Sequence, residues 1–271
     1  MRGTPVAEGR LLGVRLSVVE AGEVLARVER AIETGAPLSI TFLNPTYLMA
    51  AHRDPGLRER INRFDLVLAD GWGIVHGARF LGIPVPTRLA NDDIGPDLLR
   101  LSADRGWRTF LFGSAPGVAE RAAATLVRLL PGLPVVGTRH GYWDVVRGHP
   151  GRFDPADERS AVEAVNAAGT DVVWVGIPTP LQQRWATTYR HRIEAPVLIT
   201  GGAYLDHLTE GLDTYYPSWA VRWHLCWLYK LALEPRRLWR RYTIEMAQYA
   251  GLLLRARARQ GVRARPPTPS G

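Results

Sequence analysis

The chain has 271 residues, of which 46% are hydrophobic and 22% are charged, with one cysteine and a net charge of +8. A chain of this length and composition buries a large core, which excludes disorder throughout. The single cysteine excludes an intrachain disulfide framework, and no Cys/His cluster has the spacing of a zinc site. Arginines interrupt the N-terminal segment and no apolar run is long enough to span a bilayer, so we expect a cytoplasmic protein without a signal peptide.

The excess positive charge is confined to the C-terminal end of the chain. Residues 235–271 hold nine arginines and one acidic residue, Glu245, whereas basic and acidic residues balance in the rest. This distribution excludes an evenly basic nucleic-acid-binding domain. It indicates a local anionic partner, which is a lipid headgroup, a diphosphate or a nucleic acid.

Apolar, β-branched runs alternate with helical patterns along most of the chain. The predicted strands span Leu38–Leu43, Asp65–Ala69, Arg108–Phe112, Val172–Gly176 and Pro196–Thr200. The predicted helices span Val19–Glu33, Thr46–Ala51, Gly73–Leu81, Ile94–Arg105, Val118–Leu130, Pro155–Ala167 and Gln182–Ile193. This alternation is typical of a Rossmann-like α/β fold, in which helices flank a mainly parallel sheet.

The pattern changes after Gly211. Trp219, Trp223 and Trp227 recur at every fourth residue, which predicts one amphipathic helix, and a second predicted helix runs from Pro235 to about Arg259. We therefore interpret 1–211 as the α/β body, 212–259 as a helical membrane-docking appendage and 260–271 as a disordered basic tail.

Tryptophans and arginines occur together in the appendage, as in a helix that lies at a membrane surface. The arginines expected to meet lipid phosphates or an acceptor diphosphate are Arg222, Arg236, Arg237, Arg240 and Arg241. The alternatives for the tryptophan stripe are a buried core or an interface in a homo-oligomer.

In α/β sheets, ligands bind beyond the carboxyl ends of the strands. The residues that follow the predicted strands and suit this role are Asn44, Asp70 with Gly71, Gly113, Gln182 with Gln183, and Gly201 with Gly202. The carboxylate of Asp70, directly after a strand and beside a glycine, is suited to act as a general base. The alternative is that it caps the following helix.

The other candidates also have two interpretations each. The Gly113–Gly117 loop either holds a phosphate on its backbone or is an ordinary strand–helix turn, since it matches no nucleotide-binding fingerprint. Gln182 and Gln183 either read a base or a sugar or are solvated. Arg88 and Asp93 either bind a phosphate and a sugar hydroxyl or form a surface ion pair. No Asp-x-Asp follows a strand, so we expect neither a metal nor another cofactor.

Taken in order, these pieces resemble the bacterial WecG/TagA/CpsF glycosyltransferases from about Leu12 to Tyr242. The resemblance rests on residues 44–45, 69–73, 88–93, 112–113, 116–120, 141–142, 171–176, 180–183, 201–203 and 234–242. It implies an inverting, metal-independent transfer of N-acetylmannosamine or a related sugar from a UDP-sugar to a polyprenyl-diphosphate-linked saccharide, in cell-surface polysaccharide synthesis. It also implies a peripheral protein on the inner face of the plasma membrane.

The resemblance also assigns roles to individual residues. It makes Asp70 the general base, places Asn44 and Gln182 in the same pocket, and gives the appendage the tasks of docking on the membrane and supplying arginines. The chain departs from the family pattern at Asn91, Gln183, Tyr215, Cys226 and Lys230. The alternatives are a glucosyl, glucuronosyl or mannosaminuronosyl donor, a non-catalytic nucleotide- or membrane-binding module and, on the basic tail alone, a nucleic-acid binder.

Overall fold

The computed structural model describes residues 6–141, 155–212, 217–223, 226–233 and 235–263. The strands are β1 (Ala7–Leu11), β2 (Val14–Val18), β3 (Leu38–Leu43), β4 (Leu66–Ala69), β5 (Thr109–Gly113), β6 (Val135–Arg139), β7 (Val172–Gly176) and β8 (Val197–Thr200). The helices of the body are α1 (Ala21–Thr34), α2 (Pro45–Arg53), α3 (Pro55–Asn62), α4 (Trp72–Phe80), α5 (Asn91–Arg105), α6 (Val118–Leu129), α8 (Pro155–Ala167), α9 (Leu181–Tyr189), η1 (Arg190–Arg192) and α10 (Tyr204–Leu208).

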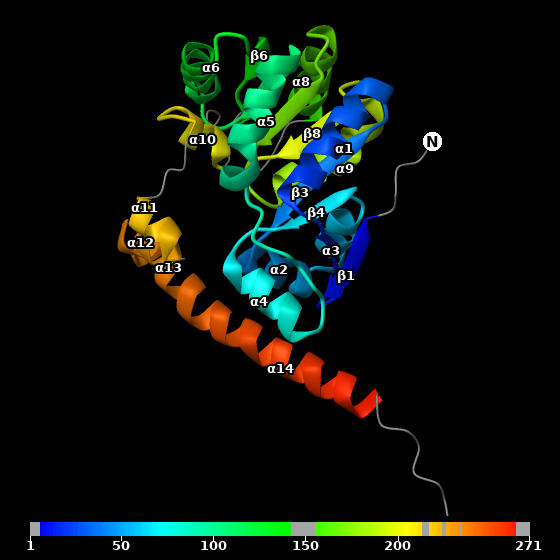
Figure 1. The fold of residues 1–271 in the computed structure, drawn as a ribbon, viewed down its shortest axis with the longest axis vertical. Helices are drawn as coiled ribbons and strands as arrows, with labels where there is room; N and C mark the ends of the chain where they lie inside the picture. Colours follow the sequence, from blue (N-terminus) through cyan, green and yellow to red (C-terminus); the bar gives the residue numbers. More distant parts are fainter. Residues whose placement is uncertain (1–5, 142–154, 213–216, 224–225, 234, 264–271) are drawn as a thin grey trace, which may run out of the picture.

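Six parallel strands form the central sheet in the order β4-β3-β8-β7-β5-β6, which confirms the predicted α/β fold (Figure 1). All five predicted strands lie in it. The sequence patterns missed β6, a half-buried edge strand, because it contains few apolar residues. They also missed the antiparallel β1–β2 hairpin, which lies beside β4, where the Ser17 hydroxyl accepts a 3.1 Å hydrogen bond from the Val67 amide.

Helices cover both faces of the sheet, which explains why its strands read as continuous apolar runs. In β7, Val172 and Trp174 face one core, whereas Val173 and Val175 face the other, as the two-residue period of a strand requires. Helices α1, α5, α6 and α10 cover the first face, and helices α2, α3, α4, α8, α9 and α14 cover the second. Helices α3 and α10 were not predicted, because α3 is mostly polar and α10 is short.

The C-terminal region is α11 (Ser218–Arg222), α12 (Cys226–Leu233), α13 (Pro235–Arg240), the π-helical turn η2 (Arg241–Glu245) and α14 (Met246–Arg263). The prediction of one tryptophan-striped helix was therefore wrong, since α11 and α12 are separate helices. The second predicted helix is interrupted at η2 and continues to Arg263, past its expected end. Residues 264–271, predicted to be disordered, lie outside the described residues.

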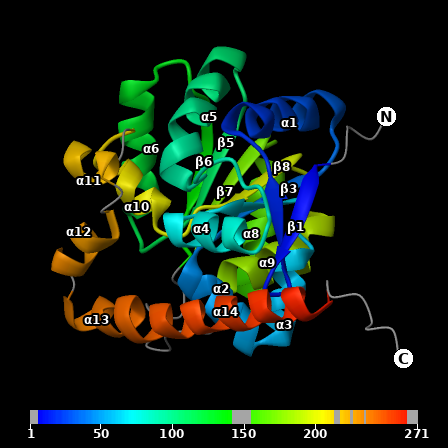
Figure 2. The ribbon, with the colours of Figure 1, turned by 60° about the horizontal axis from the view of Figure 1, so that its bottom comes forward.

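Helix α14 packs along the body across α2 and α4 (Figures 1 and 2). Tyr249 is only 2% exposed, and its hydroxyl donates a 3.0 Å hydrogen bond to the carbonyl oxygen of Gly73. Arg53 of α2 also donates a hydrogen bond to Gln248. The last helix of the predicted appendage thus belongs to the core of the body. Among the described residues, no helix combines the length and apolar character needed to cross a membrane.

The ion pair between Arg108 and Asp171 joins the starts of β5 and β7. The Asp171 carboxylate accepts hydrogen bonds from the Arg108 amide at 2.8 Å and from its guanidinium at 2.9 and 3.1 Å. Burial raises the pKa of Asp171, but the hydrogen bonds and charge of Arg108 outweigh burial and hold the pKa below its ordinary value. A carboxyl group with a lowered pKa stabilises the fold at neutral pH and loses that contribution as the pH falls through the folded-state pKa.

We therefore expect Asp171→Asn to lower the free energy of unfolding by about 1 kcal/mol at neutral pH, below the ~1.5–3 kcal/mol of a hydrogen bond to a charged group, because the Arg108 side chain is 51% exposed. The difference from the wild type should shrink toward zero in acid, where the carboxyl group of the wild-type protein is itself protonated. Urea unfolding of both proteins at neutral pH and at about pH 2, below the lowered pKa, measures this. An equal difference at both pH values would contradict the linkage.

Candidate active site

The carboxyl ends of β3 and β4 bring Asn44 and Asp70 side by side. Leu43 and Ala69 are partners in the register of the two strands, so the next residue of each leaves the sheet at the same point. The Asn44 side-chain amide nitrogen lies 3.5 Å from an Asp70 carboxylate oxygen, at the long end of the hydrogen-bond range. The expectation that these two residues share a site is consistent with this geometry.

Asn44 is held in place because its side chain also caps α2. Its side-chain oxygen accepts a 2.9 Å hydrogen bond from the Tyr47 amide, and Pro45 occupies the first turn of the helix. With the oxygen committed to the cap, the amide NH₂ group is directed toward Asp70. The cap therefore orients a donor on the carboxylate.

Asp70 does not occupy the N-cap position of α4, which was the alternative interpretation of this residue. That position is Gly71, whose φ of +100° favours glycine and which offers no capping side chain. Gly73 follows in the first turn, and a Cβ atom there would lie 2.9 Å from the Pro45 ring. The N-termini of α2 and α4 therefore meet beside Asp70.

Gln182 connects two loops at this edge of the sheet. Its side-chain oxygen accepts a 3.0 Å hydrogen bond from the Gly202 amide, and its side-chain nitrogen donates a 3.0 Å bond to the Thr179 hydroxyl. The side chain is 5% exposed. Gln182 thus lies at the edge where the sequence placed it, together with Gly201 and Gly202, and it positions the loop after β8.

The segment before α5 completes the edge. The Leu89 amide donates a 2.8 Å hydrogen bond to the Ala69 carbonyl oxygen, directly before Asp70. The Asn91 side chain donates bonds of 3.4 and 3.3 Å to the carbonyl oxygens of Thr200 and Gly201. The side-chain oxygen of Asn91 is buried, and no hydrogen-bond partner for it is found in the described part of the chain. The sequence patterns did not identify this oxygen as a candidate ligand.

Arg88 and Asp93 bind each other in this segment. One Asp93 oxygen accepts a hydrogen bond from the Arg88 guanidinium, and the other accepts a 2.7 Å bond from the Ala90 amide. Burial raises the pKa of Asp93, and the charge of Arg88 opposes that rise. The two side chains form a partly buried ion pair, not the surface pair of the alternative interpretation, and Asp93 also holds the first turn of α5.

Gly113 is explained by close packing of the backbone. A Cβ atom there would lie 2.4 Å from the carbonyl carbon of Gly176, and the residue has a φ of +141°. The next amide, of Ser114, donates a 2.7 Å hydrogen bond to the Gly176 carbonyl oxygen, and the Ser114 hydroxyl donates a 2.9 Å bond to Asp206. The loop runs from β5 to α6, as in the strand–helix turn interpretation, and the Ser114 bond ties it to the end of β7.

Gln183, which the sequence analysis placed among the substrate-binding residues, lies inside the protein. Its side chain is fully buried, and its nitrogen donates a 3.4 Å hydrogen bond to the Thr41 hydroxyl inside the protein. Thr41 in turn accepts a 2.9 Å bond from Thr200. Neighbouring residues on a helix point in different directions, and the turn that brings Gln182 to the edge sends Gln183 inward.

The exposed surface of the C-terminal helices is rich in large apolar side chains. Those with the largest exposed fractions are Trp219, Trp223, Leu228, Leu233, Trp239, Ile244 and Leu254. Arg222 and Arg236 are exposed beside them. The side chains of Trp227, Arg237, Arg240 and Arg241, and residues Tyr142, Tyr215 and Tyr216, lie outside the described residues.

Comparisons with known proteins cover both the α/β body and the C-terminal helices. A model of the glycosyl transferase WecG/TagA/CpsF family matches residues 9–263. The chain is 28% identical over 202 residues to an N-acetylglucosaminyldiphosphoundecaprenol N-acetyl-beta-D-mannosaminyltransferase of Bacillus spizizenii. The aligned residues cover 74% of this chain and 73% of that protein.

Two further relatives have the same name. That of Bacillus subtilis is 26% identical over 216 residues, covering 80% of this chain and 78% of its own. That of Staphylococcus aureus strain NCTC 8325 is 23% identical over 212 residues, covering 78% of each chain. The family match spans the Asn44–Asp70 edge, the Gln182 loop and α14, and so the chain is a glycosyltransferase that belongs to the WecG/TagA/CpsF family.

Proposed function

We propose that the protein transfers an N-acetylmannosaminyl group from a UDP-linked donor to N-acetylglucosaminyl-diphosphoundecaprenol with inversion at the anomeric carbon. The names of the relatives support this acceptor and this sugar. The structural observation that carries the proposal is the Asn44–Asp70 pair where β3 and β4 end, beside the N-terminus of α4.

Asp70 acts as the general base in this proposal. A hydroxyl oxygen of the acceptor sugar forms the new bond to the anomeric carbon, while the bond from that carbon to the diphosphate oxygen breaks. The hydroxyl proton passes to the Asp70 carboxylate, and the electron pair leaves with the diphosphate. Asn44 orients the carboxylate through its amide NH₂ group, which is directed at Asp70 because the side-chain oxygen caps α2.

The leaving diphosphate needs positive charge at the same edge. The N-terminus of α4, whose N-cap is a glycine, offers backbone N–H groups and the positive end of a helix dipole. The appendage arginines supply the remaining charge, because a guanidinium binds phosphate oxygens through two parallel hydrogen bonds.

The exposed aromatic residues of α11–α13 hold the protein on the anionic inner face of the plasma membrane, where a polyprenyl-linked acceptor resides. Trp223 is 68% exposed and Trp219 is 49% exposed, which in water leaves a large apolar area uncovered. Tryptophan at headgroup depth and arginine on lipid phosphates are the usual pair in interfacial helices. A peripheral location follows from this proposal.

A donor comparison tests the reaction. The full chain is incubated with a polyprenyl-diphosphate-linked N-acetylglucosamine and, separately, with UDP-N-acetylmannosamine, UDP-glucose and UDP-glucuronic acid. We expect the highest kcat/KM with UDP-N-acetylmannosamine. A higher value with another donor would replace the sugar but keep the enzyme class, and binding of every donor without transfer would indicate a non-catalytic module.

We expect chelation to leave the transfer rate largely unchanged, since arginines and helix N-termini are proposed to stabilise the leaving group. Among the described residues, no group of three or more His, Cys, Asp or Glu side chains is placed to hold a metal ion. The measurement is the rate in excess EDTA, with magnesium restored as the control. A rate that disappears with EDTA and returns with magnesium would overturn this account of the leaving group.

A further inference from the structure

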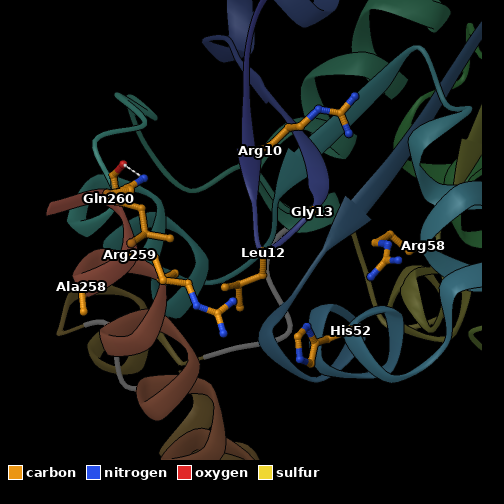
Figure 3. Close-up of a pocket in the computed structure, with 10 residues that line it drawn as sticks. Arg10, Leu12, Gly13, His52, Arg58, Ala258, Arg259 and Gln260 are labelled. Carbon is orange, nitrogen blue, oxygen red and sulfur yellow. Dashed lines mark hydrogen bonds between the residues drawn. The ribbon is translucent and has the colours of Figure 1, made fainter. Parts of the chain in front are cut away.

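A second site with its own chemistry lies at the far end of α14. A cavity of about 860 Å³ opens there between the β1–β2 hairpin, α2, α3 and α14 (Figure 3). Arg259 lies ten residues beyond Tyr249, which contacts α4 near Asp70, and ten residues of helix span about 15 Å. The volume is within the usual range for small-molecule sites.

Four basic side chains line this cavity, from segments far apart in the sequence: Arg10 of β1, His52 of α2, Arg58 of α3 and Arg259 of α14. Among the residues that the structure describes, no acidic one lines it. In the described part of the chain, none of the four has an ion pair or a hydrogen bond. The cavity therefore concentrates positive charge with no internal counter-charge.

The acidic residues nearest to Arg10 and Arg58 along the chain are committed to other arginines. Glu8, two residues before Arg10, pairs with Arg15 at 2.9 Å. Glu59, next to Arg58, pairs with Arg63 at 2.6 Å. Since the acids beside two of the cavity's arginines are engaged elsewhere, these arginines are left for an external anion.

Two residues of the hairpin, Arg10 and Leu12, lie at the rim of the cavity. Arg10 is directly opposite Arg15 in the strand register, and like charges at such positions are destabilising. Leu12 has a φ of +49°, a conformation that is costly for a bulky residue, and its side chain is directed toward Arg259 (Figure 3). The positive φ of Leu12 also belongs to the two-residue turn between β1 and β2, in which Leu11 pairs with Val14 and Gly13 has a φ of +89°.

We propose that this cavity binds the phosphate group of a ligand that is separate from the donor and acceptor of the transfer reaction. The guanidinium groups of Arg58 and Arg259 supply the charged hydrogen-bond donors, and His52 adds a donor beside them. Leu12, Leu81, Ala256 and Ala258 form an apolar wall next to these donors. The same chemistry suits the phosphate of a phospholipid headgroup and a free phosphate ester.

The full chain is tested with two kinds of probe. Soluble probes are inorganic phosphate and glycerol 3-phosphate, each compared with chloride at equal ionic strength. Membrane probes are phosphatidylcholine vesicles with and without phosphatidylglycerol, assayed by flotation. The test variant is Arg58→Gln/Arg259→Gln, and the matched control is Arg128→Gln/Arg255→Gln, which removes the same charge from exposed helix positions outside the cavity.

We expect the test variant to bind its probe at least about tenfold more weakly than the wild type, since one lost charge-assisted hydrogen bond is already worth that factor. The control should bind like the wild type. If the test variant binds the soluble probes more weakly than the wild type, the ligand is a free phosphate ester. If it binds only the phosphatidylglycerol vesicles more weakly, the ligand is a lipid headgroup.

Equal binding by the test variant and the control would overturn the proposal, as would an effect of phosphate that chloride reproduces. Arg58 packs against Gly13, so the double variant has a risk of misfolding. Arg259→Gln alone changes an exposed side chain that has no hydrogen bond or ion pair with the described residues, and it provides the second measurement. Wild-type affinity for all probes in that variant and in Arg10→Gln would equally refute the site.

Discussion

Replacing Asp70 with asparagine is expected to lower kcat by a factor of about 10² to 10⁴, the usual worth of a general base. Asparagine has nearly the same shape but does not accept the proton that leaves the acceptor hydroxyl. The fold should persist, because the N-cap of α4 is Gly71 and does not depend on the carboxylate. The affinity for the donor should change little.

The measurement is single-turnover transfer with saturating donor, together with donor binding by calorimetry. Asp97→Asn is the matched control, since Asp97 is an exposed carboxylate in a surface ion pair on α5. A kcat for Asp70→Asn within a factor of a few of the wild type would remove Asp70 from the mechanism. The Asn44 contact would then only describe how two loops pack.

The second large effect is expected from the exposed tryptophans. Trp219→Ser/Trp223→Ser should weaken binding to anionic vesicles more than tenfold, because burying a large apolar side chain contributes about 1.5–3 kcal/mol. Transfer to an undecaprenyl-linked acceptor should fall in parallel. Transfer to a short, water-soluble acceptor analogue should stay close to the wild-type rate, since neither side chain is assigned to the reaction.

Val127→Ser/Leu129→Ser is the control for this prediction. Both residues are exposed apolar side chains, but they lie on α6, away from the C-terminal helices. Vesicle flotation and the two acceptor assays are made on all three proteins. Equal vesicle binding by both variants would show that α11 does not dock, and the tryptophans would then be candidates for an interface between copies of the chain.

Membrane docking is tested with point variants and not with a truncated chain, because α14 packs on the body. A chain ending at Gly211 lacks Tyr249, which is 2% exposed, together with the partly buried Met246 and Leu253 that pack on the same core. The loss would uncover apolar area on α2 and α4 next to Asp70. We therefore expect the truncated chain to be unstable, which would obscure any effect on membrane binding.

The amino-acid sequence by itself determined five of the six strands of the sheet, the fold class and the edge of the sheet where the candidate site lies. These follow from local patterns, because an apolar run between turn residues forms a buried strand wherever a sheet forms. The rule that ligands bind beyond the carboxyl ends of parallel strands then selected Asn44, Asp70, Gln182 and Gly201. Their proximity required only that neighbouring parallel strands end together.

The tertiary structure decided which side chains face the site and which partners they have. Gln183 is sent inward by the turn of its helix, and Arg88 is paired with Asp93, because both outcomes depend on how α9 and α5 pack against the sheet. The positions of the β1–β2 hairpin and of α14 are set by the apolar surface that they bury against the body. The local periodicity of the sequence does not predict these positions. The cavity of Arg10, Arg58 and Arg259 exists only because that packing joins three segments that are distant in the sequence.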